Sequence, residues 1–491
     1  MSTKRKFLVA LAVFLVVFGG FAFWIWRGTP AKYTTEQLSG RDPVLAEPDP
    51  EQIPSVSIAE PIGWAAGEAP TAAPGLVVGR FAEGLDHPRT MLTLPNGDVI
   101  VALTNSPTLD MGGGLTGWIA ARLMSRAGAG TPSPDALVLL RDADGDGRAE
   151  GRFTLRQENG LASPSGLAWQ NDTLYVANHD AVLAFPYKLG ETALSAAPQK
   201  LMDLPGGGNH WMRNLVLGPD GKTLYVAVGS SSNIGENGMD KEQRRAAILE
   251  YTFGAKYPRP YAQGLRNPNG MAWNPSTGEL WTVVNERDQL GPDLVPDYLT
   301  NVPVGAHYGW PWIYWKVHDD DRVVAMPPDY IDDFVRKPEY ALGAHVAPLG
   351  LAFATGGQRL GARFTNGAFI ARHGSWNRDP LGGFDVVFVA FDANGNPLAK
   401  PVPLLTGFLT GKGTTHGRPT WVAFDKAGGL LVSDDTAGII WRAIDPKAAP
   451  APAPQAVSAG RLPPPRELKG DPRVEAQYKA GFKTDQKVEK Q

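Results

Sequence analysis

The chain has 491 residues, a length that would divide into two or three ordinary domains but that one closed all-β fold can also fill. The 47 Lys and Arg residues nearly balance the 50 Asp and Glu residues, and no long basic run is present, so nucleic acid is excluded as an expected partner. Cysteine is absent, which excludes disulfides, thiolate metal sites, iron–sulfur clusters and covalently attached c-type haem. The 57 Gly and 43 Pro residues favour many short strands joined by turns over a helical bundle.

The N-terminus has the pattern of an export signal. Lys4, Arg5 and Lys6 precede an uncharged stretch at 7–26, which is about the 20 residues that a helix needs to cross a bilayer. The positive charges should stay in the cytoplasm, so we expect the body of the protein on the periplasmic side of the inner membrane, anchored by residues 1–29 as a transmembrane helix. A cleaved signal peptide is the alternative, and both interpretations export the chain.

Two segments flank the part of the chain that should fold. Residues 30–75 are rich in Pro, Ala and acidic residues without a sustained period, which predicts a semi-extended tether. Residues 446–491 begin with a Pro/Ala run and continue as a charged tail, which predicts disorder. The remaining 76–445 form the expected folded domain.

One pattern recurs along this domain: an apolar strand, a turn built on Asn, Asp or Gly, and a second apolar strand. Such repeated hairpins are typical of propeller blades, whose closure into a ring leaves few open strand edges. The six copies lie at 86–103, 163–178, 209–229, 267–285, 347–374 and 417–435. The sequence therefore predicts an all-β fold, a six-bladed β-propeller, with a site at the face where loops converge on the central channel.

An acidic turn precedes the second blade. Asp142, Asp144 and Asp146 alternate with small residues up to Gly147, a spacing that places carboxylates around a hard cation such as calcium. The twelfth position, where an EF-hand needs Glu, is Phe153, so we expect a shorter calcium loop with a structural role rather than an EF-hand.

A glycine-rich stretch at 112–117 matches G-x-G-x-x-G and precedes a segment at 118–126 that could be helical. A dinucleotide-binding fold needs alternating strands and helices, and none follow here. We interpret the stretch as an insertion between the first two blades.

His210 stands out among the eight histidines because it lies in a Gly-rich segment just before a strand of the third copy, where an inward-facing residue would reach the channel. Five motifs around it occur in a characteristic order: GGNHWMRNLVLGPDGKTLYVAVGS, GLRNPNGMAW, VNERDQLGPDLVPDYLT with HYGWPW, RHGSWNR and GRPTWVAFDKAGGLLVSDD. Together they resemble the glucose/sorbosone dehydrogenase family of quinone-dependent propellers, and the sorbosone dehydrogenase branch most. The resemblance covers about residues 76–444.

The resemblance implies a cofactor, pyrroloquinoline quinone, and a calcium ion beside it. It implies that His210 is the general base and that Arg266 and Asn267 contact the quinone and the reacting centre. Arg418 resembles a family arginine that pairs with a cofactor carboxylate. The turn of Asn285, Glu286, Arg287 and Asp288 corresponds to the one that supplies oxygens to calcium, partly from backbone carbonyls.

Two departures from the family pattern remain open. Asn209 occupies the place of an Asp that precedes the base in glucose-oxidising members, so the orientation of the base needs another explanation. A cofactor-binding Lys of those members has no clear counterpart, and Arg372 or Arg378 is expected to replace it. Trp376 between them is expected to stack on the quinone or sugar.

The expected chemistry is oxidation of a sugar, or of a sugar-derived aldehyde or alcohol such as sorbosone. Calcium and arginine would polarise the quinone while His210 removes the hydroxyl proton and hydride leaves the substrate carbon. Because the chain has no haem motif, electrons should pass to a separate acceptor, a membrane quinone or a cytochrome. Two alternatives remain: a calcium-dependent lactonase-type hydrolase on a similar propeller, and a propeller that only binds a partner.

Overall fold

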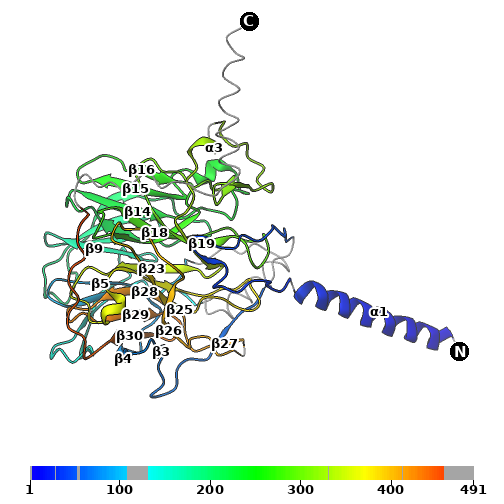
Figure 1. Ribbon diagram of the computed structural model, residues 1–491, viewed down its shortest axis with the longest axis horizontal. Coiled ribbons are helices and arrows are strands. Elements are labelled where there is room, and N and C mark those ends of the chain that lie inside the picture. Colours follow the sequence, from blue (N-terminus) through cyan, green and yellow to red (C-terminus); the bar gives the residue numbers. More distant parts are fainter. Residues whose placement is uncertain are drawn as a thin grey trace, which may run out of the picture.

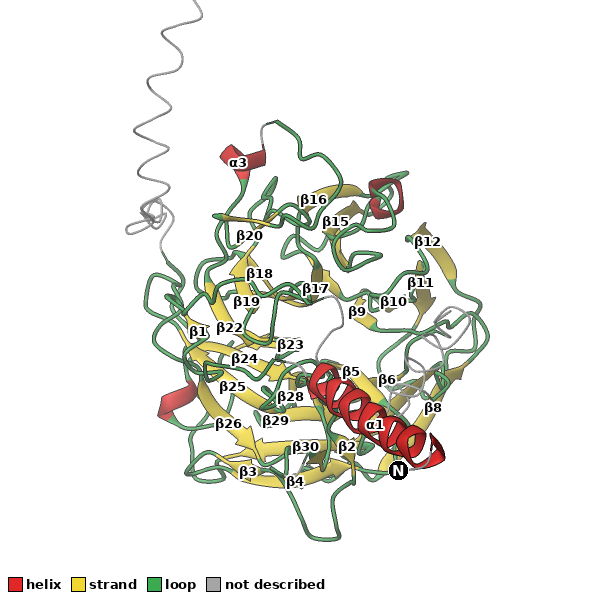
Figure 2. Cartoon of the chain, turned by 90° about the vertical axis from the view of Figure 1, so that its right-hand side faces the viewer, coloured by secondary structure: helices red, strands yellow, loops and turns green. Residues whose placement is uncertain are grey.

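The computed structural model of the chain describes residues 3–27, 29–51, 56–107, 131–329, 331–411 and 413–457. Strands dominate these residues, and they form six sheets of four or five strands arranged around one axis (Figures 1 and 2). The predicted all-β fold and six-bladed propeller are therefore confirmed.

The blades follow one another along the chain, and each is an antiparallel meander. The first blade consists of β5 (Pro88–Thr93), β6 (Val99–Leu103), β7 (Ala136–Arg141) and β8 (Gly151–Gln157). The second consists of β9 (Gly166–Gln170), β10 (Thr173–Ala177), β11 (Ala181–Pro186) and β12 (Gln199–Asp203). The third consists of β13 (Leu215–Leu217), β14 (Thr223–Val228), β15 (Ala247–Thr252) and β16 (Arg259–Gln263). The fourth consists of β17 (Asn267–Trp273), β18 (Leu280–Asn285), β19 (Pro296–Asn301) and β22 (Tyr340–Ala344), and the fifth of β23 (Pro348–Phe353), β24 (Gly367–Arg372), β25 (Asp385–Ala390) and β26 (Val402–Thr406).

The sixth blade is built from both ends of the folded domain. It contains β28 (Pro419–Phe424), β29 (Leu430–Asp434) and β30 (Ile439–Ile444), and its outermost strand is β4 (Val77–Ala82), which pairs antiparallel with β30. The ring is thus closed by hydrogen bonds between segments that are far apart in the sequence.

Each of the six predicted hairpins forms the first two strands of a blade, because its turn residues suit a tight reversal. In the second blade, Asn171 and Asp172 have φ of 49° and 54°, the positive values that a two-residue type I′ turn requires. The side chains of the six sheets pack between neighbouring blades, and every residue of β6 is buried in this way.

The first strand of every blade lies innermost. These strands contact one another in the order β5, β9, β13, β17, β23, β28 and back to β5, and Figure 2 shows the later strands of each blade toward the rim. Because the six strands occupy equivalent positions in successive blades, the residues just before them meet at one end of the channel. His210, Arg266 and Arg418 all belong to this set.

The N-terminal segment 30–75 differs from the expected tether. Its β1 (Ser39–Gly40) extends the fourth blade beyond β22, and its β3 (Thr71–Ala72) extends the fifth blade beyond β26. Between them β2 (Glu60–Pro61) pairs with β27 (Thr414–Thr415), and the Trp64 indole donates a hydrogen bond to Asp434 at 3.0 Å. These strands are too short to show an alternation of apolar and polar residues in the sequence, yet they cover the open edges of two blades.

Smaller elements complete the described chain. A helix, α1 (Thr3–Arg27), projects from the propeller (Figure 1), and no helix among the described residues is long and apolar enough to cross a membrane. The fourth blade carries an insertion with β20 (Ile313–Tyr314), β21 (His318–Asp319) and α3 (Ile331–Phe334). Two 3-10 helices, η1 (Met239–Glu242) and η2 (Ala362–Phe364), lie in loops of the third and fifth blades.

Two sequence predictions concern residues that are not described. The glycine-rich stretch at 112–117 and the possible helix at 118–126 lie outside the described residues, and so does the tail after residue 457. The part of the tail that is described packs on the propeller: the backbone N–H of Val457 donates to the carbonyl of Ser276 at 2.7 Å.

Candidate active site

His210 lies at the channel end of the third blade, between β12 and β13. Its backbone carbonyl accepts a hydrogen bond of 2.8 Å from the buried guanidinium of Arg213, which fixes the loop. The missing β-carbon of Gly229 would lie 2.6 Å from Cβ of His210 and 2.4 Å from Oδ1 of Asn267. Only glycine at position 229 therefore leaves room for these two side chains.

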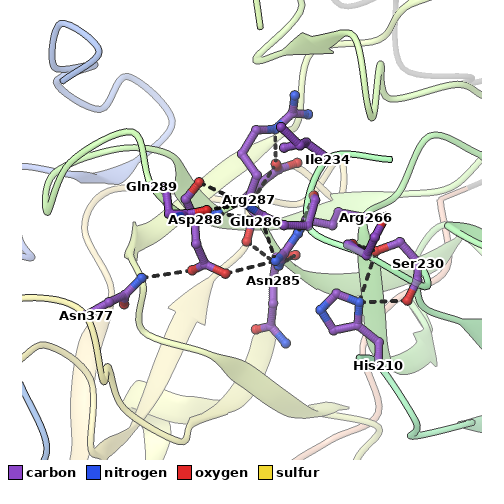
Figure 3. Close-up of polar contacts among 12 residues, drawn as sticks. His210, Ser230, Ile234, Arg266, Asn285, Glu286, Arg287, Asp288, Gln289 and Asn377 are labelled. Atoms are coloured by element: carbon purple, nitrogen blue, oxygen red, sulfur yellow. Dashed lines mark hydrogen bonds and ion pairs between the residues drawn. The ribbon is translucent and has the colours of Figure 1, made fainter. Parts of the chain in front are cut away.

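Ser230 orients the His210 ring. Nδ1 of His210 lies 2.9 Å from the backbone carbonyl oxygen of Ser230 and 3.0 Å from its hydroxyl oxygen (Figure 3). A carbonyl only accepts, and the hydroxyl hydrogen is already donated to the carbonyl of Ser232 at 2.6 Å. Nδ1 therefore carries the hydrogen, and Nε2, which no described group contacts by a hydrogen bond, keeps a lone pair that can accept a proton.

The surroundings keep this imidazole neutral. Burial and then the positive charge of Arg266 lower the pKa of His210 to about 3, although its hydrogen bond to Ser230 opposes the shift. Asn209, in the place of the family's Asp, is exposed, and no hydrogen bond joins its side chain to the ring in the described structure. Ser230, twenty positions away in sequence, orients the ring instead.

Arg266 and Asp288 form an ion pair beside His210. Nη2 of Arg266 lies 2.9 Å from Oδ2 of Asp288 and 2.8 Å from Oδ1 of Asn233, and Nη1 donates to the carbonyl of Glu286. Burial alone would raise the pKa of Asp288, but Arg266 and the neighbouring His345 outweigh it and hold that pKa below its usual range. The Arg266 guanidinium is thus engaged by the chain itself, and it orients Asp288 rather than facing the channel unpaired.

Glu286 and Arg287, expected at the calcium turn, point into the protein instead. Arg287 is fully buried, where it pairs with Glu286 at 3.0 Å (Figure 3). It also pairs with Asp320 at 3.3 Å. These side chains fasten the 286–288 turn to the insertion of the fourth blade. Asp288 is the one of the three whose side chain is partly exposed, at 22%.

The two arginines expected to replace the family's Lys are occupied elsewhere. Arg372 forms a bidentate pair with Asp385, its neighbour across β24 and β25, at 2.7 and 2.5 Å. Arg378 is buried against Asp293 at 2.6 Å and donates to the carbonyl of Tyr33 in the N-terminal segment. Both guanidinium groups therefore already pair with carboxylates of the chain. The sequence could not predict these ion pairs, because it does not show which acid lies beside which arginine. Trp376 is 40% exposed.

Arg418 differs from these arginines. It is buried over the ring of Phe384, with 4.9 Å from its guanidinium carbon to the ring centroid, and its Nε and Nη2 have no hydrogen-bond partner in the described structure. The carboxamide oxygens of Asn267 and Asn285, which face each other across β17 and β18, are also buried without a partner. Buried polar atoms are almost always satisfied, so unpaired donors and acceptors at one end of the channel indicate a place for a polar ligand.

This donor and acceptor set fits a carboxylated quinone with a calcium ion. A guanidinium with two free N–H groups can pair with a carboxylate, and carboxamide oxygens are ligands that calcium accepts. The fit rests on Arg418, Asn267 and Asn285, whereas Arg372, Arg378 and Arg287 already pair with carboxylates of the chain itself.

Sequence reasoning missed a cluster next to Asp288. His345 lies 3.5 Å from Oδ1 of Asp288, and Nδ2 of Asn377 donates to the same oxygen at 2.9 Å. Burial lowers the pKa of His345, but the hydrogen bond and charge of Asp288 outweigh it and raise the pKa above its usual value. Asp297, which accepts N–H groups from Glu286 and Ala347, is buried, and burial raises its pKa to about 7.

A second missed cluster borders Arg418. Asp435 accepts from Arg89 at 2.8 Å and from His373 at 3.0 Å, and the Arg89 guanidinium lies 5.2 Å from the ring centroid of Trp211, the neighbour of His210. His373 stands in the RHGSWNR motif and Asp435 ends the GRPTWVAFDKAGGLLVSDD motif, whereas Arg89 lies in β5 of the first blade. The motif order was the signal that could have found His373 and Asp435.

The acidic turn lies apart from this site, between the two outer strands of the first blade. The carboxylates of Asp142, Asp144 and Asp146 are joined by Glu150, and their oxygens lie within 4.8 Å of one another. Several of these oxygens accept backbone N–H groups of the same turn, such as Gly145 N–H to Asp142 at 2.8 Å. Glu150 was missed because it lies outside the motif spacing.

Comparison with known proteins identifies the family of the chain. A family described as TrAA12-like matches residues 138–301 and 330–446. The chain belongs to the TrAA12-like family. A pyrroloquinoline quinone-dependent sugar dehydrogenase of Hypocrea jecorina is 26% identical to this TrAA12-like chain over an alignment of 426 residues that covers 76% of this chain and 89% of the relative.

Two solved structures show the same fold as this TrAA12-like chain. The iodide structure of a Trichoderma reesei carbohydrate-active enzyme of family AA12 has a TM-score of 0.62 at 21% identity and covers 80% of this chain and 99% of that one. The holo form of the pyranose dehydrogenase PQQ domain from Coprinopsis cinerea has a TM-score of 0.59 at 20% identity and covers 79% and 100%. The resemblance to quinone-dependent sugar dehydrogenases is confirmed, whereas the sorbosone branch stays a prediction.

Proposed function

We propose that the chain is a pyrroloquinoline quinone-dependent dehydrogenase that oxidises a sugar, or a sugar-derived alcohol or aldehyde of the sorbosone kind. The observation that carries the proposal is His210, whose Nδ1–H is tied to Ser230 while Nε2 is left to accept a proton. Unpaired Arg418 and the free oxygens of Asn267 and Asn285 at the same end of the channel support a bound anionic cofactor with its cation. The Hypocrea jecorina relative bears the same cofactor in its name.

When bound, pyrroloquinoline quinone would accept two electrons with the substrate hydrogen, and calcium would make its carbonyl a better acceptor. His210 Nε2 takes the proton of the substrate hydroxyl as hydride leaves the carbon that bears it, and the product is a carbonyl compound. The positive imidazole that results is stabilised by Ser230, whose carbonyl accepts the Nδ1–H. Arg418 would hold a carboxylate of the quinone, and Arg266 keeps Asp288 in place beside the base.

Reconstitution tests this function. The full chain, freed of metal and cofactor, is given calcium and pyrroloquinoline quinone together or singly, and reduction of an artificial dye is followed over a panel of aldoses, polyols and sorbosone. Activity that needs both additions supports the proposal. Absence of both quinone binding and dye reduction over the whole panel would exclude it.

Location is a further part of the proposal. The basic cluster before the uncharged stretch 7–26 supports export to the periplasmic side of the inner membrane, where a membrane quinone or a cytochrome could take the electrons. Cell fractionation with N-terminal sequencing of the mature chain tests both export and retention.

A further inference from the structure

A buried carboxyl group, Glu242, lies behind the Ser230 contact of His210. It ends the short helix η1 in the loop between β14 and β15 and is 6% exposed. One of its oxygens accepts the backbone N–H of Ser231 at 2.7 Å, and the other accepts the hydroxyl of Ser232 at 2.7 Å. The residue lies outside the sequence motifs described above.

The N–H that Glu242 accepts and the carbonyl that faces His210 belong to one peptide unit, between Ser230 and Ser231. In a trans peptide the N–H and C=O point in opposite directions. The Glu242 carboxylate and the His210 imidazole therefore form hydrogen bonds to opposite sides of the same planar peptide unit. A hydrogen bond to a charged acceptor also polarises the peptide, which strengthens its carbonyl as an acceptor from Nδ1–H.

A rotation of this peptide would reverse the chemistry of the base. The Ser231 N–H would then face Nδ1 of His210, which could only accept it, so the ring hydrogen would move to Nε2 and block proton uptake. An ionised Glu242 opposes this rotation, because it has no hydrogen to offer the carbonyl that would turn toward it. A glutamine at 242 would have one.

We propose that Glu242 is a positioning residue that acts through the Ser230–Ser231 peptide to keep the hydrogen of His210 on Nδ1 and Nε2 open for the substrate proton. The inference deepens the proposed function and rests on His210 being its base. A carboxyl group thus serves the imidazole through a peptide, in a chain where Asn209 replaces the acid next to it.

The test compares Glu242→Gln with Glu250→Gln as a matched control. Glu250 is also a buried carboxyl group of the third blade, but it pairs with Arg259 at 3.0 Å and has no link to His210. Long-range ¹H–¹⁵N spectra of the ¹⁵N-histidine-labelled full chain report the tautomer, and His210→Gln identifies the signal. Spectra are taken with and without quinone and calcium, and melting temperatures verify folding.

The wild type and Glu250→Gln should show the Nδ1–H tautomer, and Glu242→Gln should show partial or complete conversion to Nε2–H. In the loaded enzyme kcat should fall by about 10- to 100-fold in Glu242→Gln, as for other residues that orient a functional histidine, with quinone affinity unchanged. Glu242→Asp, which still offers only acceptors, should retain the Nδ1–H tautomer.

Nε2–H in the wild type, or an unchanged Nδ1–H tautomer in a folded Glu242→Gln protein, would overturn the inference. If Glu242→Gln does not fold, Glu242→Asp decides, and Nε2–H there would also overturn it. The spectra need no turnover, so a chain with the expected tautomers but without sugar oxidation would refute the proposed function and leave the positioning role intact.

Discussion

At the scale of single residues, His210 should separate catalysis from cofactor binding. His210→Ala removes the proposed base but none of the groups proposed to hold the quinone, so quinone affinity should be retained while kcat falls by about 10²–10⁴-fold. Quinone titration, steady-state rates and a melting curve on both proteins test this. A variant with near-normal kcat would remove His210 as the base, and one with a much lower melting temperature would indicate a structural role.

The environment of His210 predicts an unusual pH profile. Because burial and Arg266 lower its pKa to about 3, the imidazole stays unprotonated well below the ordinary histidine value of about 6.5. The acid-side fall of kcat/KM should therefore lie far below pH 6, and in Arg266→Gln, where a positive charge is removed, it should move toward neutral pH. An acid limb of the wild type near pH 6.5 would contradict the assignment.

Arg418 and Arg372 should respond to mutation in opposite ways. Arg418→Met removes unpaired buried N–H groups, so the cofactor-free protein should keep or gain thermal stability while quinone affinity falls strongly. Arg372→Met leaves Asp385 without its partner, so it should lower stability by about 3 kcal/mol and leave quinone affinity nearly unchanged. Melting curves and quinone titrations on the two variants test both expectations, and a similar loss of quinone affinity in the two variants would contradict them.

These residues also mark what the sequence could reveal of the site. His210 and Arg418 could be found because each lies in a motif with a recognisable order. The pairing of Arg372 with Asp385 depends on strand register, and that of Arg378 with Asp293 depends on a loop contact across 85 positions. The sequence therefore does not show that both arginines are already paired with acids of the chain. Glu242 lies in none of the motifs, and Ser230 only ends the first one; neither role could be found from the sequence, because both depend on the orientation of one peptide plane.

At the scale of elements, the N-terminal segment should contribute to stability. A chain that starts at residue 29 keeps β1, β2 and β3, whereas one that starts at 76 exposes the edges of β22 and β26 and removes the acceptor of Arg378 at Tyr33. Open edges promote association between chains. The shorter chain should melt at a lower temperature and aggregate in light scattering, and equal behaviour of both would show that the edge strands are dispensable.

The hairpins could be predicted and the edge strands could not, for a physical reason. In a hairpin, turn residues such as Asn171 and Asp172 and alternating apolar residues act within a few positions, so the sequence records them locally. The strands β1 and β3 have two residues each and owe their pairing to exposed N–H and C=O groups of blades formed much later in the chain. A Pro-rich composition therefore looked like a tether although it covers a surface.

At the scale of the whole molecule, the junction between β4 and β30 should determine global stability. Val78 and Ala443 are neighbours across this junction, and the chain has no cysteine that could interfere with a cross-link. A disulfide in Val78→Cys/Ala443→Cys would close a loop around the entire propeller and should add about 4–5 kcal/mol to the free energy of unfolding. The reduced double variant is the matched control, and equal melting temperatures with and without reductant would contradict the prediction.

The same junction bears on the order of events during synthesis. β4 leaves the ribosome near the start of the domain, but its partner β30 is made last, so the first blade strand to appear must wait for the final one. Such long-range pairing is slow to form. Blades one to five can assemble as the chain emerges, yet the ring, and with it the circle of residues around His210, is completed only after translation has nearly ended. For an exported chain, completion would then fall after translocation, on the side of the membrane where the cofactor is to be bound.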